Sequence, residues 1–288
     1  MAARTYRRCL VARAPRGECA TFTRALTIAL SYAPAMRRRP RLRTLALLGL
    51  IITLAVSACA VSACATLERA GANYWELSSE PSGQAPDPAQ TPEPVIQVYA
   101  ARTVGWRGLV AVHTWIVLKR AEAPAYTRYE VMGWGVESGR PAIRVNRMGP
   151  DNHWFGSRPV RLVDRRGPEV SALIEKVEAA IKDYPYPDRY RSWPGPNSNT
   201  FLAHIGRAVP ELRLDLPATA IGKDFLPNGD LAARAPSGTG VQLSLFGLAG
   251  VLVGLEEGLE VNVLGLSFGL DLNRPALRLP VAGRLGFP

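Results

Sequence analysis

The chain carries one long uncharged apolar segment near its N-terminus, flanked by a cluster of arginines. Residues 44–67 hold no formal charge and lie between Arg43 and Glu68. As a helix, 24 residues would span roughly 36 Å, enough to cross the hydrocarbon core of a bilayer. Arginine-rich flanks stay on the cytoplasmic side of such segments. The sequence therefore predicts that everything after this membrane segment is exported.

The charge of the chain is concentrated in the same region. Residues 1–43 contain eleven arginines and one acid, Glu18, so they carry +10 of the total net charge of +11. The rest of the chain is close to neutral, which argues against a basic groove for phosphate backbones. We therefore predict no nucleic-acid partner, and we assign the arginines to the membrane signal.

The apolar segment has three interpretations: an uncleaved anchor, a signal peptide cut after Ala65, or a lipoprotein signal. The sequences VSAC ending at Cys59 and VSAC ending at Cys64 each resemble the lipobox of bacterial lipoproteins. We favour the lipoprotein signal, with lipidation at Cys59 or Cys64. The alternative is that small residues are merely tolerated in a membrane helix.

The first residues of the chain are expected to contribute little to the fold. Met36 is followed by three arginines and is typical of the start of a signal. We therefore predict that residues 1–43 form a basic disordered leader and that translation starts at Met36, so that residues 1–35 are an over-extended reading frame or at most disordered. None of the four cysteines lies beyond residue 64, so the exported part has no disulfide and no cysteine nucleophile.

Composition divides the remainder into three parts. Residues 68–94 are predicted to be a linker: residues 68–77 predict a short helical exit, and residues 78–94, rich in Pro, Ser and Gly, predict an extended linker or a strap across the domain surface. Residues 95–235 predict an α+β core domain. Residues 236–288 contain ten of the glycines and predict a β extension.

The core is expected to be an antiparallel sheet with two main helices. Apolar and β-branched runs predict strands at residues 95–101, 109–118, 126–134 and 143–147, and residues 151–163 predict a polar loop. Residues 109–118 are apolar on both faces, which is typical of a central strand. Helical periodicity predicts helices at residues 168–183 and 198–208.

The C-terminal part predicts short antiparallel strands in a meander. Leu266, Phe268, Leu270 and Leu272 alternate with smaller or polar residues, the period of a strand. The uncharged stretch 236–255 leaves a second membrane helix as an alternative, although its glycines and polar residues disfavour one.

Two features of the core domain point to chemistry. His113 lies inside an apolar strand, where a histidine costs free energy unless it is paired or used. The run PNSNTF places Asn197 and Ser198 at the start of the second helix, where the helix dipole and unpaired N–H groups stabilise negative charge. The simpler interpretations are a satisfied core histidine and an N-cap.

This arrangement resembles the circularly permuted papain-like proteins, which include relatives of the NlpC/P60 hydrolases. In that group a strand histidine precedes a helix that opens with an Asn-Cys-x-(His/Thr)-Phe-like motif, whose cysteine is the nucleophile. Here Ser198 occupies the cysteine position. This departure matters because an oxygen nucleophile needs a better base than a thiol. The site is therefore either a serine variant or a retired active site kept for binding.

The resemblance implies roles for five residues. Ser198 would be the nucleophile and His113 its base, oriented by Glu130 from the neighbouring strand, while Asn197 or Asn199 would donate to an oxyanion. Such a hydrolase needs Ser198 Oγ within hydrogen-bond reach of a His113 ring nitrogen in an open cleft.

The remaining polar and aromatic residues are weaker candidates. His204 follows Ser198 by six residues and points elsewhere, and His153 lies in a loop. A metal site at His153 and Asp151 has no supporting ligand spacing, and the glycine-rich runs do not match a nucleotide-binding loop, so we predict no metal and no cofactor. Four aromatic residues could stack on a sugar or peptide but more often pack loops, namely Tyr184, Tyr186, Tyr190 and Trp193.

A second resemblance covers most of the exported chain. The words NYWELSS, QVYAARTVGWRG, HTWIVLK, YRSWPGPNSNTF and GKDF are similar, in this order, to the bacterial family named domain of unknown function 3750. That resemblance implies a membrane-associated envelope protein without supplying an activity. We expect a periplasmic domain tethered to the inner or outer membrane that hydrolyses an amide or ester. The partners would be the membrane and an envelope peptide, glycan or lipid. The alternative is a non-catalytic structural or binding lipoprotein.

Overall fold

The computed structural model describes residues 49, 53, 57 and 76–286. The chain divides into Met1–Ile51 and Ile52–Pro288, and all that follows concerns the second unit. The predicted leader, with Met36, and both candidate lipidation sites, Cys59 and Cys64, lie outside the described residues, as does nearly all of the segment 44–67. Within the part that is described, no helix combines the length and apolar character needed to cross a bilayer.

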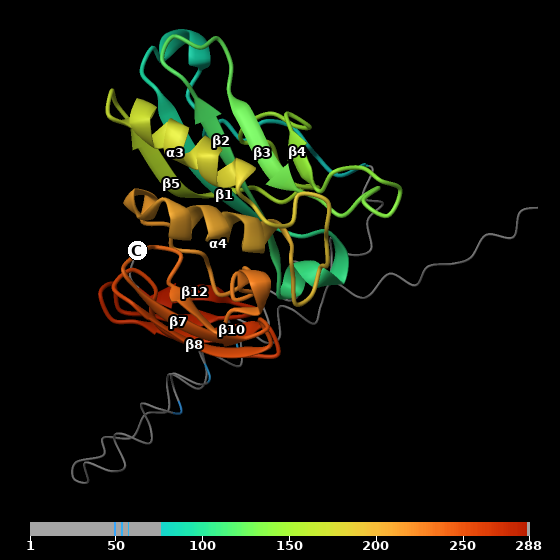
Figure 1. The fold of residues 1–288 in the computed structure, drawn as a ribbon, viewed down its shortest axis with the longest axis vertical. Coiled ribbons are helices and arrows are strands. Elements are labelled where there is room, and N and C mark those ends of the chain that lie inside the picture. The colour runs from blue at the N-terminus through green and yellow to red at the C-terminus, as the bar shows by residue number, and fades with distance from the viewer. Residues whose placement is uncertain (1–48, 50–52, 54–56, 58–75, 287–288) are drawn as a thin grey trace, which may run out of the picture. The chain divides into compact units, whose positions relative to one another are not determined.

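The first layer is a five-stranded sheet in the order β4-β3-β2-β1-β5, in which all neighbours are antiparallel. Its strands are β1 (Val95–Arg102), β2 (Val112–Lys119), β3 (Thr127–Val131), β4 (Ile143–Val145) and β5 (Val160–Arg166). Strand β2 is central, as predicted, and buried along its whole length because its side chains are covered on both faces. Figure 1 shows this sheet with the helices in front of it.

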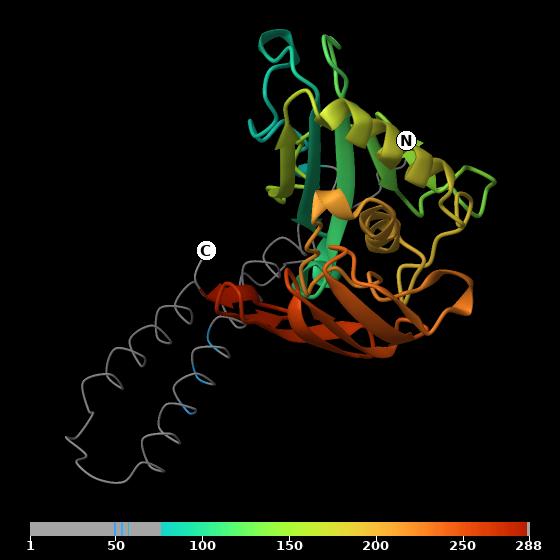
Figure 2. The ribbon, with the colours of Figure 1, turned by 60° about the vertical axis from the view of Figure 1, so that its left-hand side comes forward.

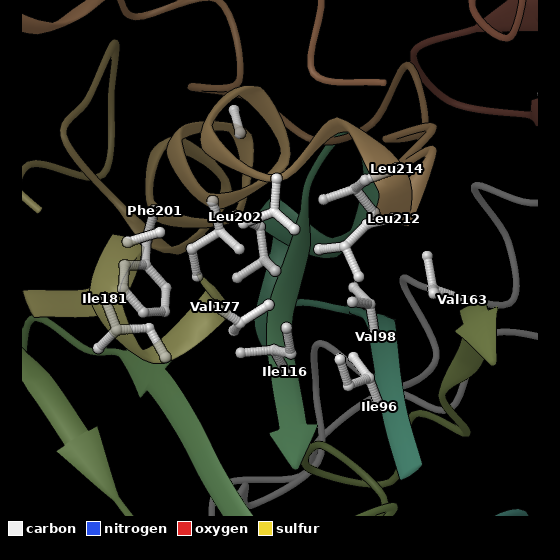
Figure 3. Close-up of a cluster of buried hydrophobic side chains, with 14 of the residues drawn as sticks. Ile96, Val98, Ile116, Val163, Val177, Ile181, Phe201, Leu202, Leu212 and Leu214 are labelled. Atoms are coloured by element: carbon white, nitrogen blue, oxygen red, sulfur yellow. The ribbon is translucent and has the colours of Figure 1, made fainter. Parts of the chain in front are cut away.

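Two helices, α3 (Val170–Lys182) and α4 (Ser198–Ala208), cover one face of this sheet, so the predicted α+β class is confirmed. Their apolar stripes meet those of β1 and β2 in the main core. Figure 3 shows Ile116 of β2 facing Val177 of α3 and Leu202 of α4. This packing fixes the N-terminus of α4 against the central strand.

The opposite face of the sheet carries a smaller core around Tyr99, Trp115 and Trp154. Residues 76–94 run along this side as a strap. Ser82 Oγ donates a 2.9 Å hydrogen bond to Asp151 Oδ2, and the Gln84 N–H donates one of 2.5 Å to the same oxygen. Of the two predicted alternatives for this segment, the structure shows the strap.

The predicted loop over residues 151–163 is wrong at its C-terminal end, because β5 begins at Val160 and pairs antiparallel with β1. Only one residue of this edge strand, Val163, is buried, and three of its last four residues are charged, so the sequence lacks the apolar alternation of a strand. The strand forms because this segment pairs with β1. The predicted strand at residues 109–118 also starts too early, because Gly105–Leu109 is a 3-10 helix.

The second layer is a seven-stranded antiparallel meander, which confirms the predicted topology of the glycine-rich region. It comprises β6 (Ala232–Arg234), β7 (Gly240–Leu245), β8 (Ala249–Gly254), β9 (Gly258–Val263), β10 (Leu266–Asp271), β11 (Ala276–Leu279) and β12 (Gly283–Gly286). Strands β7 and β8 occupy the stretch 236–255, which excludes the alternative of a membrane helix there. Figure 2 shows this sheet in orange and red, beside α4.

Polar side chains hold the second sheet against the core domain. Asp224 accepts hydrogen bonds from Gln242 of β7, Asn262 of β9 and Ser267 of β10, the last two at 2.6 and 3.2 Å. The adjacent Lys223 is ion-paired with Glu260. These strands therefore turn their polar side chains inward, because a buried carboxylate needs donors around it.

Candidate functional site

The site lies where β2 and β3 separate. Their register ends at the pair Trp115 and Glu130, although β2 begins earlier, at Val112, and β3 continues to Val131. A cavity of about 670 Å³ occupies this separation, within the usual size of a ligand pocket. His113 and Ser198 both line it.

The N-terminus of α4 reaches this cavity through a capping box. Asn197 Oδ1 accepts hydrogen bonds from the N–H groups of Asn199 and Thr200, and Thr200 Oγ1 accepts one from the Asn197 N–H. Among the described residues, the Ser198 N–H is the one N-terminal donor of α4 without an acceptor. A helix N-terminus with an unpaired N–H favours negative charge placed beside it.

The two asparagine amides, predicted as oxyanion donors, serve a structural purpose in this arrangement. Asn197 Nδ2 donates to the carbonyl oxygens of Ser192 and Ile221 at 3.1 and 3.0 Å. Asn199 Nδ2 donates to those of Val112 and Ile221 at 3.1 and 2.7 Å. Since each amide nitrogen has two hydrogens, both amides are already committed: Asn199 fixes α4 to β2 and to the loop at Ile221, and Asn197 fixes it to the loops at Ser192 and Ile221.

Ser198 and His113 share the cavity but do not contact each other directly. Ser198 Oγ accepts a 3.5 Å hydrogen bond from the backbone N–H of Thr114, which is the residue after His113. The expected hydrogen bond between Ser198 and the imidazole is not formed within the described part of the chain.

A buried ion-pair network holds the Nε2 edge of the imidazole. His113 Nε2 lies 2.8 Å from Glu130 Oε2, and Arg128 Nη2 donates to the same oxygen at 2.8 Å. Trp154 stacks on the histidine ring, with centroids 3.8 Å apart and planes inclined by 18°. The ring is therefore oriented by a carboxylate at one edge and an indole across one face.

The electrostatics of the network define the protonation of His113. Burial lowers the pKa of His113 more than Glu130 raises it. Burial alone would raise the pKa of Glu130, but His113 and Arg128 outweigh it, and the pKa falls below its usual range. Because an ionised carboxylate only accepts hydrogen bonds, the neutral imidazole carries its proton on Nε2. Its second nitrogen, Nδ1, is then an unprotonated acceptor.

Residues 93–225 match the family model described as "Protein of unknown function (DUF3750)". The match confirms the predicted resemblance to that family. Comparisons with curated proteins and with solved structures gave no match.

Residues 93–225, here called the DUF3750 segment, contain every residue predicted for the site. The second sheet and its turns add Leu264 and Leu266 to the wall of the cavity. Four of the five short sequences that resemble the family lie within this segment. One of them, GKDF, provides Lys223 and Asp224, which secure the second sheet.

Of the weaker candidates in the DUF3750 segment, some line the cavity and others lie away from it. Tyr190 and Trp193 line the cavity, whereas Tyr184 and Tyr186 are buried in the main core. Two histidines bind backbone carbonyls away from the cavity: His153 contacts Glu80 O, and His204 contacts Ala180 O. In the described part of the chain, no cluster of His, Cys, Asp or Glu is arranged to hold a metal ion.

Sequence reasoning missed two residues of the His113 network. Arg128 precedes Glu130 by two positions on β3, so both side chains lie on one face, a signal that strand periodicity could have provided. Trp154 lies in a loop, and its approach to His113 depends on how that loop folds back. The sequence holds no local signal for that contact.

Proposed function

We propose that the DUF3750 segment is a serine-variant hydrolase domain of circularly permuted papain-like type. Its substrate would be an ester or amide of the cell envelope. One observation carries the proposal: a neutral, oriented imidazole and a hydroxyl at a helix N-terminus line the same cavity. The order of the elements, a histidine strand before the helix that bears the nucleophile, also fits that fold.

In this mechanism Ser198 Oγ attacks the acyl carbon and its proton passes to His113 Nδ1. Glu130 stabilises the imidazolium that forms. The Ser198 N–H and the dipole of α4 stabilise the developing oxyanion. The leaving group departs with the proton from His113, and water then hydrolyses the acyl-serine by the same steps. The two asparagines act as positioning residues.

The mechanism requires the Ser198 side chain to change rotamer. Its hydroxyl now faces the Thr114 N–H, and rotation about the Cα–Cβ bond moves Oγ between staggered positions. Catalytic hydrogen bonds often form only once substrate is bound. The backbone N–H of Thr114 would then be free to contact substrate.

The same proposal places the domain at a membrane. Residues 44–67 would tether it to the envelope, through a lipid on Cys59 or Cys64 or as an uncleaved anchor, with the domain in the periplasm. Mass spectrometry of the mature N-terminus tests this directly. A diacylglyceryl-modified cysteine supports the lipoprotein form, an intact segment supports the anchor, and a start after Ala65 contradicts the tether.

Labelling by a serine-directed fluorophosphonate tests the catalytic part. We expect the full-length protein to be labelled, and Ser198→Ala and His113→Ala to lose at least about a hundredfold of the labelling rate. Ser171→Ala, at an exposed position of α3, is the matched control and keeps the wild-type rate. Labelling that survives in Ser198→Ala overturns the assignment of the nucleophile.

A binding module is the second candidate, favoured by the hydrogen bond that occupies Ser198 and by the tryptophans around the cavity. Trp106, Trp134 and Trp193 line it and remain largely exposed. For a binding module we expect envelope peptides or glycans to quench tryptophan fluorescence equally in the wild type and Ser198→Ala. Fluorophosphonate would then label neither protein.

A further inference from the structure

The second sheet has the reverse of the usual polarity. Every outward position of strands β7–β10 holds an apolar residue, whereas the inward positions hold polar or charged residues and glycines, with Leu252 as the one large apolar side chain among them. We call the outward set the apolar face: Val241, Leu243, Leu245, Ala249, Val251, Val253, Leu259, Val261, Val263, Leu266, Phe268 and Leu270. The inward side is satisfied by Asp224 and Lys223, so the apolar face is left to the exterior.

The apolar face is continuous across the strands. The register joins Val241, Val253, Leu259 and Leu270 in one row, which continues into β11 at Leu277. Neighbouring rows run parallel to it, so the residues form one patch. Val241 is 65% and Phe268 45% exposed. A single-sheet face of this kind marks a contact surface, because soluble monomers rarely expose apolar patches of such extent.

One end of the apolar face adjoins the cavity. The β9–β10 turn contains Leu264, which is exposed and also lines the cavity, and Trp193 Nε1 donates a 3.0 Å hydrogen bond to its carbonyl oxygen. Phe246 is exposed in the β7–β8 turn at the same end of the sheet. Exposed tryptophan beside leucine and phenylalanine is the composition that proteins place at the bilayer interface.

The edge of the apolar face offers positive charge. Arg234 of β6 pairs with Val241, so its side chain lies on the same side of the sheet, and it is exposed. Long arginine side chains reach from an apolar surface to lipid phosphates. The apolar face with a basic edge therefore matches the boundary between acyl chains and anionic headgroups.

The start of the described chain also lies near this sheet. Leu77 shares a small pocket with Arg102, and Arg102 Nη2 donates a 2.6 Å hydrogen bond to Val281 O between β11 and β12. Eight residues separate the predicted membrane segment from Glu76, and they span at most roughly 30 Å. The tether would therefore hold the sheet within reach of the bilayer.

We propose that the apolar face of β7–β10 docks onto the surface of an anionic lipid bilayer, which brings the mouth of the cavity to that surface. The proposal rests on the proposed tether for its proximity to the membrane, but the docking itself depends on the residues of the sheet. It implies that the substrate of the cavity is an amphiphile presented by the bilayer.

Vesicle flotation of the full-length protein tests the proposal, with a site for a specific protease introduced within residues 68–75. The vesicles contain phosphatidylglycerol and phosphatidylethanolamine. After cleavage we expect the wild-type domain to stay with the vesicles. The double variant Val253→Asp/Val261→Asp should be released, with retention weakened by roughly tenfold or more, because charge is costly at an apolar lipid contact.

Val160→Asp is the matched control, because Val160 is an equally exposed apolar residue (64%) on the first sheet. We expect it to stay bound after cleavage. Circular dichroism of each variant shows that the sheets are folded. The tether is tested separately by the uncleaved double variant, which floats only if residues 44–67 hold it to the vesicle.

Two results overturn the lipid proposal. One is release of the wild-type domain on cleavage. The other is a cleaved domain that sediments as a dimer and becomes a monomer in Val253→Asp/Val261→Asp, which would make the apolar face an interface between two copies.

Discussion

Glu130 contacts His113 diagonally across the opening between two strands. Its carboxylate lies 2.8 Å from Nε2, whereas the sheet register pairs Glu130 with Trp115. His113 lies two residues before Trp115 and therefore on the same face of the sheet, so the carboxylate reaches it diagonally while also accepting a hydrogen bond from Arg128, two residues away on its own strand.

Replacing this carboxylate tests its place in the network. In Glu130→Gln the buried Arg128 loses its counter-charge, and we expect the free energy of unfolding to fall by about 3–5 kcal/mol in urea titrations. Glu137→Gln, at an exposed position, should change it by less than about 0.5 kcal/mol. Equal stability of the two variants would contradict an ionised Glu130.

A thiol at position 198 reports the electrostatics of the helix N-terminus. In Ser198→Cys we expect α4 and the nearby imidazole to lower the thiol pKa below the usual value of about 8.5. Iodoacetamide should then alkylate position 198 at pH 7 faster than it alkylates a cysteine introduced at exposed Ser171, as measured by peptide mass spectrometry. A rate no faster than that of Ser171→Cys would show that the site does not stabilise an anion.

Gly222 supports the cap of α4. Its φ is +99°, and a Cβ there would overlap the side-chain amide of Asn197. We expect Gly222→Ala to lower the free energy of unfolding by about 2–4 kcal/mol and to abolish fluorophosphonate labelling. Gly229→Ala also has a positive φ but opens onto free space, so it should cost only about 1 kcal/mol. Similar losses in both would show that the Asn197 contact is unimportant.

Asp224 is expected to secure the second sheet. In Asp224→Ala the three inward side chains that donate to it lose their acceptor and Lys223 loses an anion, so unfolding should become easier by about 3–5 kcal/mol. We expect limited proteolysis to cut first within residues 232–286. Asp230→Ala, at an exposed position, is the control, and equal protease resistance of the two variants would refute the role.

Histidine burial predicts a dependence of stability on pH. The pKa values of His113 and His204 are lowered chiefly by burial, so below about pH 6.5 the unfolded chain binds protons that the folded chain does not. Stability is therefore lost as pH falls, with a slope of up to about 1.4 kcal/mol per pH unit for each histidine.

Asp215 has the opposite effect on stability over the same pH range, because burial raises its pKa to about 6 and the folded chain then binds the extra proton. A histidine variant is therefore needed to isolate the contribution of His204. We expect His204→Gln to lose less unfolding free energy than the wild type between pH 7.5 and 5.5. Parallel stability curves for the two proteins would show that His204 titrates normally in the folded state.

The sequence by itself determined the local elements. The apolar run around His113 made β2 a central strand, and the asparagine and serine of PNSNTF began α4 where predicted, because both signals depend on residues close together in the chain. Alternation in residues 266–272 likewise predicted a strand.

Only the tertiary structure decided how these elements are used. A period of two does not say which side of a sheet faces inward, and Asp224 turned the polar side of β10 toward the core. The position of Ser198 relative to His113, and the approach of Trp154, depend on contacts between residues tens of positions apart. Local sequence carries no information about such distances, because they are set by the packing of whole elements.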